Sequence, residues 1–188
     1  MPCRVRYPLH PVEFFSWMKR NSVIPAAVLL THGHLDHVNG VSETIEFAGK
    51  DIPVYMGKED KVELEYDLVL SSKLGLRQPK VDFKYTDAKD GDVIESAGMK
   101  FKVISTPGHS PGSVCYYDRG AAELFSGDTL FQGSVGRTDH PRGDYDSLLD
   151  SLNRKIAVLP PETDVFCGHG YPTTIGTELA TNPFLNRH

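Results

Sequence analysis

Hydrophobic positions in the first part of the chain are spaced first as in a helix and then as in a strand. Val12, Phe15 and Met18 recur every three residues behind Pro11, and this spacing predicts a helix. The apolar run from Ala26 to Leu30 comes next and is typical of a strand buried on both faces. Helices and strands are therefore expected to be mixed along the chain.

The next segment continues this mixture. Residues 41–48 predict a short helix, and residues 53–56 predict the following strand. Residues 58–74 predict a longer helix with apolar side chains on one side and charges on the other, as in an amphipathic helix. The apolar side consists of Val62, Tyr66, Val69 and Leu70.

From residue 81 onward the pattern changes to short strands. The predicted strands are residues 92–94, 100–104, 114–117, 123–125 and 164–166, and the predicted helices are residues 145–158 and 174–180. We find no repeat, low-complexity tract or linker, so residues 1–188 are predicted to form a single domain.

Composition narrows the class of protein. Apolar residues make up 39% of the chain and charged residues 24%, which is typical of a globular protein. The net charge is -5 and no cluster of lysine and arginine stands out along the sequence, which argues against a nucleic-acid partner. No apolar run is long enough to span a membrane. The cysteines Cys3, Cys115 and Cys167 show no close spacing, which favours a reducing cytoplasm over a disulfide framework.

The most informative segment is Thr31–His37, which directly follows the predicted strand at residues 26–30. It places four side chains able to bind a metal within six residues, and three more follow or end other strand-like runs. These candidates are His32, His34, Asp36, His37, His109, Asp128 and His169. Burying so many unpaired imidazoles and carboxylates would cost several kcal/mol, so shared metal ligation accounts for them best.

Two different metal-binding motifs fit these residues less well. A helical metalloprotease motif needs two histidines four residues apart with a glutamate between them, and this segment has neither that spacing nor a glutamate. Cys167 stands two residues before His169 and could form a Cys-x-His metal clip. We favour its role as a small apolar residue at the end of a buried strand.

With these segments the chain resembles the metallo-β-lactamase superfamily, in the branch of glyoxalase-II-like hydrolases. The matching segments are Thr31–His37, His109 within Thr106–Gly112, Asp128 within Ser126–Phe131, and His169. The resemblance implies a four-layered αββα sandwich of α/β class. It also implies that one metal is held by His32, His34 and His109, that a second is held by Asp36, His37 and His169, and that Asp128 bridges them. Two zinc ions are the expected cofactors, with iron or manganese as alternatives.

The bridging carboxylate also bears on the reaction. In the β-lactamases of this superfamily a cysteine usually takes the place of Asp128, so the resemblance favours thioesterases, lactonases and phosphodiesterases over true β-lactamases. Among these we expect a thioesterase. A hydroxide shared by two metals would attack the thioester carbonyl, and a thiolate leaves readily because thiols ionise near pH 8.5. Asp36 has two candidate roles, as a metal ligand or as the group that orients this hydroxide. The expected partner is a small-molecule thioester, with glutathione as one candidate carrier; homo-oligomerisation stays open.

Two residues near the predicted centre are candidates for substrate contact. Arg137 lies in the segment Gly136–Asp139, and it could orient groups around the metal ligands or an anionic substrate, or simply pair with Asp139 or Asp144. Tyr171 could contact substrate or could equally be a packed ring. The segment Gly136–Asp139 also resembles persulfide dioxygenases, which use one iron. That activity is the main alternative, and a non-catalytic homologue is the other.

The two ends of the chain differ from the family pattern. Only Met1–His10 precede the first predicted helix, so we expect the sandwich to lack its first N-terminal strands. Full-length glyoxalase II has a C-terminal helical extension that grips glutathione. This chain ends at His188 without a matching segment, so glutathione specificity does not follow from the resemblance.

Overall fold

The structure of this protein is a computed structural model that describes residues 11–76 and 78–185. Predictions about Met1–His10 lie outside these residues. The elements in chain order are α1 (Pro11–Arg20), β1 (Val28–Leu29), α2 (Leu35–Val38), α3 (Val41–Ala48), β2 (Val54–Met56), the 3-10 helix η1 (Lys58–Asp60), α4 (Lys61–Lys73), β3 (Thr86–Asp87), β4 (Val93–Ser96), β5 (Met99–Ser105), β6 (Val114–Asp118), β7 (Glu123–Gly127), β8 (Leu130–Phe131), β9 (Ser134–Val135), α5 (Tyr145–Ser151), the π-helix η2 (Leu152–Ile156), β10 (Asp164–Cys167), β11 (Thr173–Thr174) and α6 (Ile175–Thr181).

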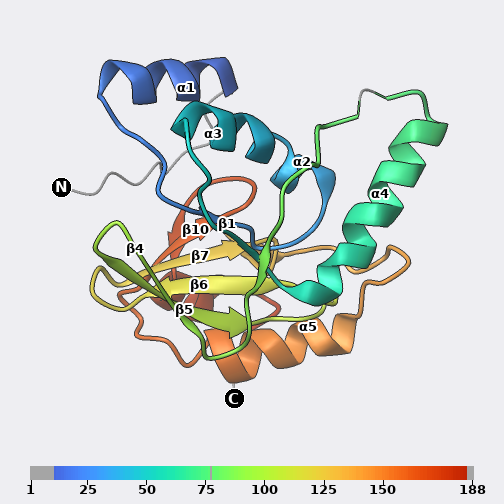
Figure 1. The fold of residues 1–188 in the computed structure, drawn as a ribbon. Coiled ribbons are helices and arrows are strands. Elements are labelled where there is room, and N and C mark those ends of the chain that lie inside the picture. The colour runs from blue at the N-terminus through green and yellow to red at the C-terminus, as the bar shows by residue number, and fades with distance from the viewer. Residues whose placement is uncertain (1–10, 77, 186–188) are drawn as a thin grey trace.

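Two sheets lie face to face between two helical layers, which confirms the predicted α/β sandwich (Figure 1). The first sheet has the order β1-β2-β3, and its strands are parallel. The second sheet has the order β11-β10-β7-β6-β5-β4. Helices α1 and α3 lie above the sheets in Figure 1, and α5 lies below them.

Three clusters of buried apolar side chains correspond to the three interfaces between these layers. Leu30, Val54 and Met56 pack with residues of α3 and α4 on one side of the first sheet. Val103 and Tyr116 belong to the cluster between the two sheets, which also includes Leu29 and Tyr55 of the first sheet. The largest cluster joins the second sheet to α5, η2 and α6. Since burial of apolar surface is the main favourable term in folding, these clusters hold the layers together.

The strand directions bring the candidate ligand segments to one edge of the second sheet. β5 and β7 are both antiparallel to β6, and β10 is parallel to β7, so β5, β7 and β10 run the same way. His109, Asp128 and His169 all follow the carboxyl ends of these strands. Loops on rigid strands at one edge are a common setting for a functional site.

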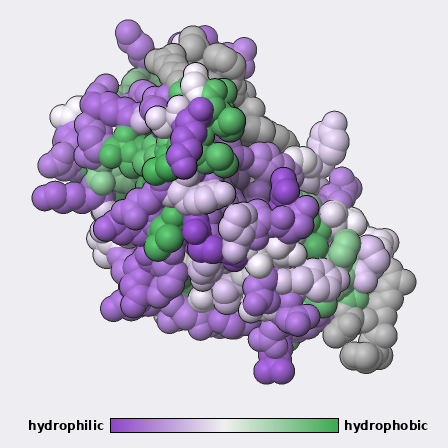
Figure 2. Space-filling view, turned by 90° about the vertical axis from the view of Figure 1, so that its right-hand side faces the viewer, coloured by the Kyte–Doolittle hydropathy of each residue, from purple (hydrophilic) through white to green (hydrophobic). Residues whose placement is uncertain are grey.

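Helix α4 differs from the prediction. The apolar side chains expected to face inward are all exposed, namely Val62, Tyr66, Val69 and Leu70. Leu64 is buried and Leu68 packs beside it, and Glu63 and Ser71 are also buried. The helix has apolar residues on both sides, so spacing alone did not identify the buried side. Figure 2 looks onto the side of the molecule where α4 lies, and hydrophobic atoms form patches in the upper part of that face.

Two further expectations need correction. The run at residues 26–30 gives only a two-residue strand that is half-buried, because β1 is at the edge of its sheet among the described residues. The helix expected at residues 145–158 forms, but it changes from α to π hydrogen bonding at Leu152. No helix in the described part of the chain is both long and apolar enough to cross a membrane.

Candidate metal centre

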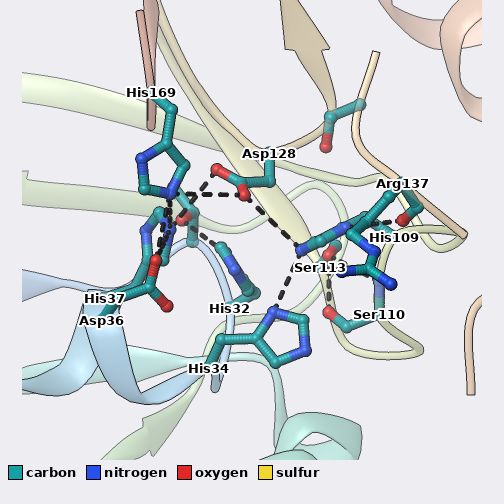
Figure 3. Close-up of polar contacts among 12 residues, drawn as sticks. His32, His34, Asp36, His37, His109, Ser110, Ser113, Asp128, Arg137 and His169 are labelled. Atoms are coloured by element: carbon teal, nitrogen blue, oxygen red, sulfur yellow. Dashed lines mark hydrogen bonds and ion pairs between the residues drawn. The ribbon is translucent and has the colours of Figure 1, made fainter. Parts of the chain in front are cut away.

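The seven candidate ligands come from four loops and meet at one place, as Figure 3 shows. The loop after β1 carries His32 and His34, and the short helix α2 that follows carries Asp36 and His37. The other loops contribute the remaining three. Their donor atoms form three overlapping groups in which all atoms lie within 4.8 Å of one another: His32, His34 and His109; His32, His37 and Asp128; and Asp36, His37 and His169.

Two histidines of the first group, His32 and His109, are buried, and the ring nitrogens of the group are oriented. His109 Nδ1 donates to the backbone carbonyl of Arg137 at 2.8 Å, which leaves Nε2 with a free lone pair. That Nε2 lies 3.0 Å from His34 Nδ1. His32 is only 1% exposed, and its Nε2 has no hydrogen-bond partner among the described residues. The three rings therefore present their nitrogens to a common point.

The second group is open to solvent. The side chains of Asp36 and His169 are 59% and 57% exposed, and His169 Nε2 lies 3.0 Å from Asp36 Oδ2. His37 Nε2 lies 3.3 Å from the same nitrogen of His169. These donors also converge, but water reaches two of the three side chains.

Asp128 lies between the two groups. Its Oδ2 is 3.6 Å from both His109 Nε2 and His169 Nε2, and its Oδ1 is 3.3 Å from His37 Nε2. Burial opposes ionisation of this carboxyl, but the surrounding His37, His109 and His169 hold its pKa below the usual range. An ionised carboxylate whose Oδ2 lies between a histidine of each group has a position that suits a bridging ligand.

The donor set fits metal ions better than it fits a hydrogen-bonded cluster. Two nitrogens bound to one tetrahedral zinc at about 2.1 Å are roughly 3.4 Å apart. The spacings of 3.0 and 3.3 Å between facing nitrogens lie near that value. Burial and then the neighbouring imidazoles lower the pKa of His32, and burial also lowers the pKa of His109, so both rings tend to be neutral. Neutral imidazole is the form that binds a metal.

Close backbone packing keeps the centre compact. A side chain at Gly168 would collide with Asp128 Oδ1 and with the His37 ring. One at Gly136 would collide with the backbone carbonyl of Asp128. Glycine is therefore required at both positions by close approach, whatever its backbone angles.

Two acidic residues that the sequence analysis missed contact the ligand-bearing loops and the His34 ring on the side away from the donor atoms. The first is Asp60, which is fully buried and accepts hydrogen bonds from Gly33 N at 2.8 Å, from Ser110 Oγ at 2.7 Å and from Gly112 N at 2.5 Å. Gly33 lies between His32 and His34, and the other two donors follow His109. Asp60 therefore ties together the two loops that carry the first group.

The second supporting residue is Glu63, on the buried side of α4. Its Oε2 lies 3.6 Å from His34 Nε2, on the opposite side of the ring from the nitrogen that faces His109. Arg142 holds the same carboxylate through two contacts of 2.6 and 3.1 Å. Neither acid has a distinctive sequence context, since both stand in an ordinary charged stretch at a helix start.

A hollow of about 610 Å³ opens over the centre. Phe131 and Val135 form an apolar part of its wall, and Arg137 and His140 also line it. His140 was missed from the sequence because no ligand motif surrounds it. Its ring lies 5.3 Å from that of His34 and 5.2 Å from that of His109, measured between centroids. A volume of this size accommodates an ordinary small-molecule substrate.

The remaining candidates have other surroundings. The Arg137 side chain is exposed and pairs with Asp139 Oδ1 at 2.7 Å, as one interpretation of this residue expected. Its backbone carbonyl orients His109, and contact of its side chain with an anionic substrate stays a prediction. Tyr171 is 77% exposed and is not among the residues that line the hollow, so its substrate contact stays a prediction. Cys167 ends β10 and belongs to none of the three groups, and burial raises the pKa of its thiol to about 11.

Comparison with known proteins identifies the family. The family model described as "Metallo-beta-lactamase superfamily" matches residues 25–169. The chain belongs to this superfamily. Within the superfamily it is 36% identical over 162 residues to hydroxyacylglutathione hydrolase GloC of Haemophilus influenzae, covering 85% of this chain and 75% of that protein.

Two solved structures are similar to this one. TTHA1623 in a di-iron-bound form is 40% identical, with a TM-score of 0.82, and the match covers 96% of this chain and 87% of that chain. BLEG-1 B3 metallo-beta-lactamase is also 40% identical, with a TM-score of 0.83 and coverage of 94% and 85%. Membership of the superfamily and the cluster of histidines and aspartates indicate a hydrolase that uses divalent metal.

Proposed function

We propose that this chain is a binuclear metal-dependent thioester hydrolase of the hydroxyacylglutathione hydrolase type. The observation that carries the proposal is the place of Asp128, whose Oδ2 is equally far from a histidine of each group. A carboxylate in that position can hold two ions about 3.5 to 4 Å apart, as two-metal hydrolases require. The similarity to GloC supports the substrate class.

In this proposal His32, His34 and His109 hold one ion, and Asp36, His37 and His169 hold the other. When bound, the pair of cations lowers the pKa of a water between them towards about 7 and polarises a carbonyl oxygen. The open second group gives the substrate access to the centre, since Asp36 and His169 are exposed. Asp36 keeps its two candidate roles, because a ligand and an orienting base would both stand at this position.

The hollow suits a thioester in two respects. Phe131 and Val135 offer an apolar wall for the acyl group. A thiol leaving group ionises near pH 8.5, so cleavage needs no strong proton donor from the protein. Arg137 and Tyr171 stay candidates for contact with the rest of the substrate.

The test is hydrolysis of S-lactoylglutathione by the zinc-loaded chain, with release of thiol measured by a coloured thiol reagent. We expect turnover in the wild type and its loss in His109→Ala. Equal turnover in His109→Ala would refute the assignment of this residue, and absence of turnover with any thioester would refute the activity.

A β-lactamase is the second candidate because BLEG-1 is as similar in sequence as TTHA1623. Asp128 stands against it, since the family resemblance gives β-lactamases a cysteine there. Hydrolysis of the chromogenic cephalosporin nitrocefin, measured beside the thioester assay, distinguishes the two. Turnover of nitrocefin with a higher kcat/KM than that of the thioester would favour the β-lactamase.

A mononuclear-iron persulfide dioxygenase is the third candidate, because His32, His109 and Asp128 could hold one ion without the second group. Oxygen consumption by an iron-loaded sample with glutathione persulfide would identify it. A non-catalytic homologue would show neither oxygen consumption nor hydrolysis and would bind metal poorly.

A further inference from the structure

A second hollow of about 700 Å³ lies away from the metal centre, and we propose that it binds a small molecule that joins two or more negative charges to a flat apolar group. It forms where the outer face of β4, β5 and β6 meets the end of η2 and the residues after it. None of its lining residues also lines the hollow over the candidate metal centre. The site is therefore independent of the proposed hydrolase.

The floor of this hollow is one row of the second sheet. Val93 pairs with Lys102, and Lys102 pairs with Tyr117, so these residues stand side by side on β4, β5 and β6. Paired residues on neighbouring strands point to the same face. Ile104 follows Lys102 on that face and is buried against η2. Val93 is 57% exposed, whereas Tyr117 and Ile104 are each only 7% exposed, so the apolar surface of the floor that a ligand can touch comes chiefly from Val93.

The wall comes from the end of the helical layer. Lys155 donates to the Ser105 carbonyl at 2.8 Å and pairs with Asp90 at 3.4 Å, which fixes the end of η2 against β5. Val158 is exposed beside it, although it is apolar. The helical layer ends here, and Val93, Lys100 and Lys102 on the face of β4 and β5 beyond it are exposed in the part of the chain that the structure describes.

The hollow collects positive charge in a chain that is acidic as a whole. Five of its thirteen lining residues are lysine or arginine and only Asp90 is acidic, whereas the net charge of the chain is -5. Three of these cations have exposed carboxylate partners: Lys100 with Glu95, Arg154 with Asp150, and Lys155 with Asp90. Such exposed pairs are weak and exchange readily.

Lys102 and Arg119 differ from the other three cations. Neither has an ion-pair partner among the residues that the structure describes, and both line the hollow together with Tyr117. An ordinary solvated face would disperse its charges over the surface. Here two unpaired cations flank a concave surface with an apolar floor, which is the arrangement that holds an anion with an apolar body. The phosphates and base of a nucleotide have this combination of charge and flat ring.

The experiment titrates three probes into the full, metal-loaded chain by calorimetry at low salt: ATP, inorganic triphosphate and adenosine. We expect ATP to bind with a micromolar Kd and to bind more tightly than either fragment, because the floor and the cations act together. Affinity should fall as sodium chloride is raised, since the charges are screened. The variant K102E/R119E should weaken ATP binding at least about tenfold.

The matched control is K50E/K84E, which changes the net charge equally but alters exposed residues that lie outside the hollow. Its ATP affinity should equal that of the wild type. K102Q/R119Q removes the two cations without adding acid, and loss of binding there with unchanged circular dichroism would exclude a folding defect.

Three results would overturn the proposal. The first is absence of ATP binding at millimolar concentration. The second is equal binding of ATP to the wild type and K102E/R119E, which would place the nucleotide at the metal centre or elsewhere. The third is binding of triphosphate alone as tightly as ATP, which would leave the apolar floor without a role.

Discussion

The two halves of the candidate metal centre are built differently. His32 and His109 are buried, whereas Asp36 and His169 are more than half exposed. Asp60 and Glu63, which are not proposed metal ligands, support the loops and the His34 ring of the first half. In the second half, the structure shows no hydrogen bond from the His169 ring to any described residue outside the centre. Outer residues that orient ligands typically change metal affinity by about 10- to 100-fold. We infer that one ion binds tightly while the other is exposed to substrate and solvent.

The largest effect is expected from removing a ligand of the supported half. His109→Ala should lower thioester hydrolysis by about 10³-fold or more, since without a complete first group the activated water is lost. Elemental analysis should find fewer than two ions per chain. His140→Ala removes a neighbouring imidazole that is not a proposed ligand, so it should keep both ions. Loss of metal in His140→Ala, with none in His109→Ala, would reverse the assignment.

Asp60→Ala tests the link between the two loops of the supported half. The change leaves Gly33 N, Gly112 N and the Ser110 hydroxyl without their acceptor. We expect the free energy of unfolding to fall by about 3 to 5 kcal/mol, measured by urea denaturation of the metal-free chain. Glu59→Ala is the control, because this neighbouring side chain is exposed, and it should change stability by less than about 0.5 kcal/mol. Equal effects of the two variants on the free energy of unfolding would show that Asp60 does not stabilise the two loops.

Glu63→Gln tests the contact behind His34. Weakening the carboxylate that faces His34 Nε2 should reduce affinity for the tightly held ion by about 10- to 100-fold, measured by competition with a chelator. Glu65→Gln, on the same helix, alters an exposed side chain that pairs with Lys61 and should leave affinity unchanged. A loss of stability in Glu63→Gln with unchanged metal affinity would assign Glu63 to its pair with Arg142 alone.

The smallest effect is expected on the exposed side of α4, whose orientation brings Glu63 inward. Val69→Ser should change the free energy of unfolding by less than about 0.5 kcal/mol, because Val69 is exposed. Leu64→Ala should cost about 2 to 4 kcal/mol, because Leu64 is buried. Thermal or urea unfolding of both variants checks this, and the reverse order would restore the helix orientation expected from the sequence.

The sequence was sufficient where chemistry is dense along the chain. Thr31–His37 holds four potential metal ligands close together in sequence. The strand before His109 shows as apolar residues alternating with lysines, and the strand before His169 shows as a short apolar run. The family resemblance then gave the layers of the fold. A site segment can be predicted from sequence when its functional residues are neighbours along the chain.

What the sequence did not reveal depends on distant residues. Asp60 bonds to loops tens of residues before and after it, and Glu63 contacts the ring of His34, which precedes it by tens of residues. No motif in their own segment predicts these contacts. The cations of the second hollow are scattered over β5, the β6–β7 turn and η2, so no basic cluster appears along the chain. The predicted buried side of α4 was wrong because both sides carry apolar residues and only packing decides between them.

The order in which the two ions leave distinguishes a tightly held ion from an exposed one. The chain is loaded with zinc, dialysed against chelator buffers of increasing strength, and its zinc content is measured at each step. We expect two ions per chain, with one lost at a chelator strength at least about tenfold lower than the other. His169→Ala should show only the later loss. A single step in which both ions leave together, or a wild type that never holds more than one ion, would contradict the unequal two-ion centre.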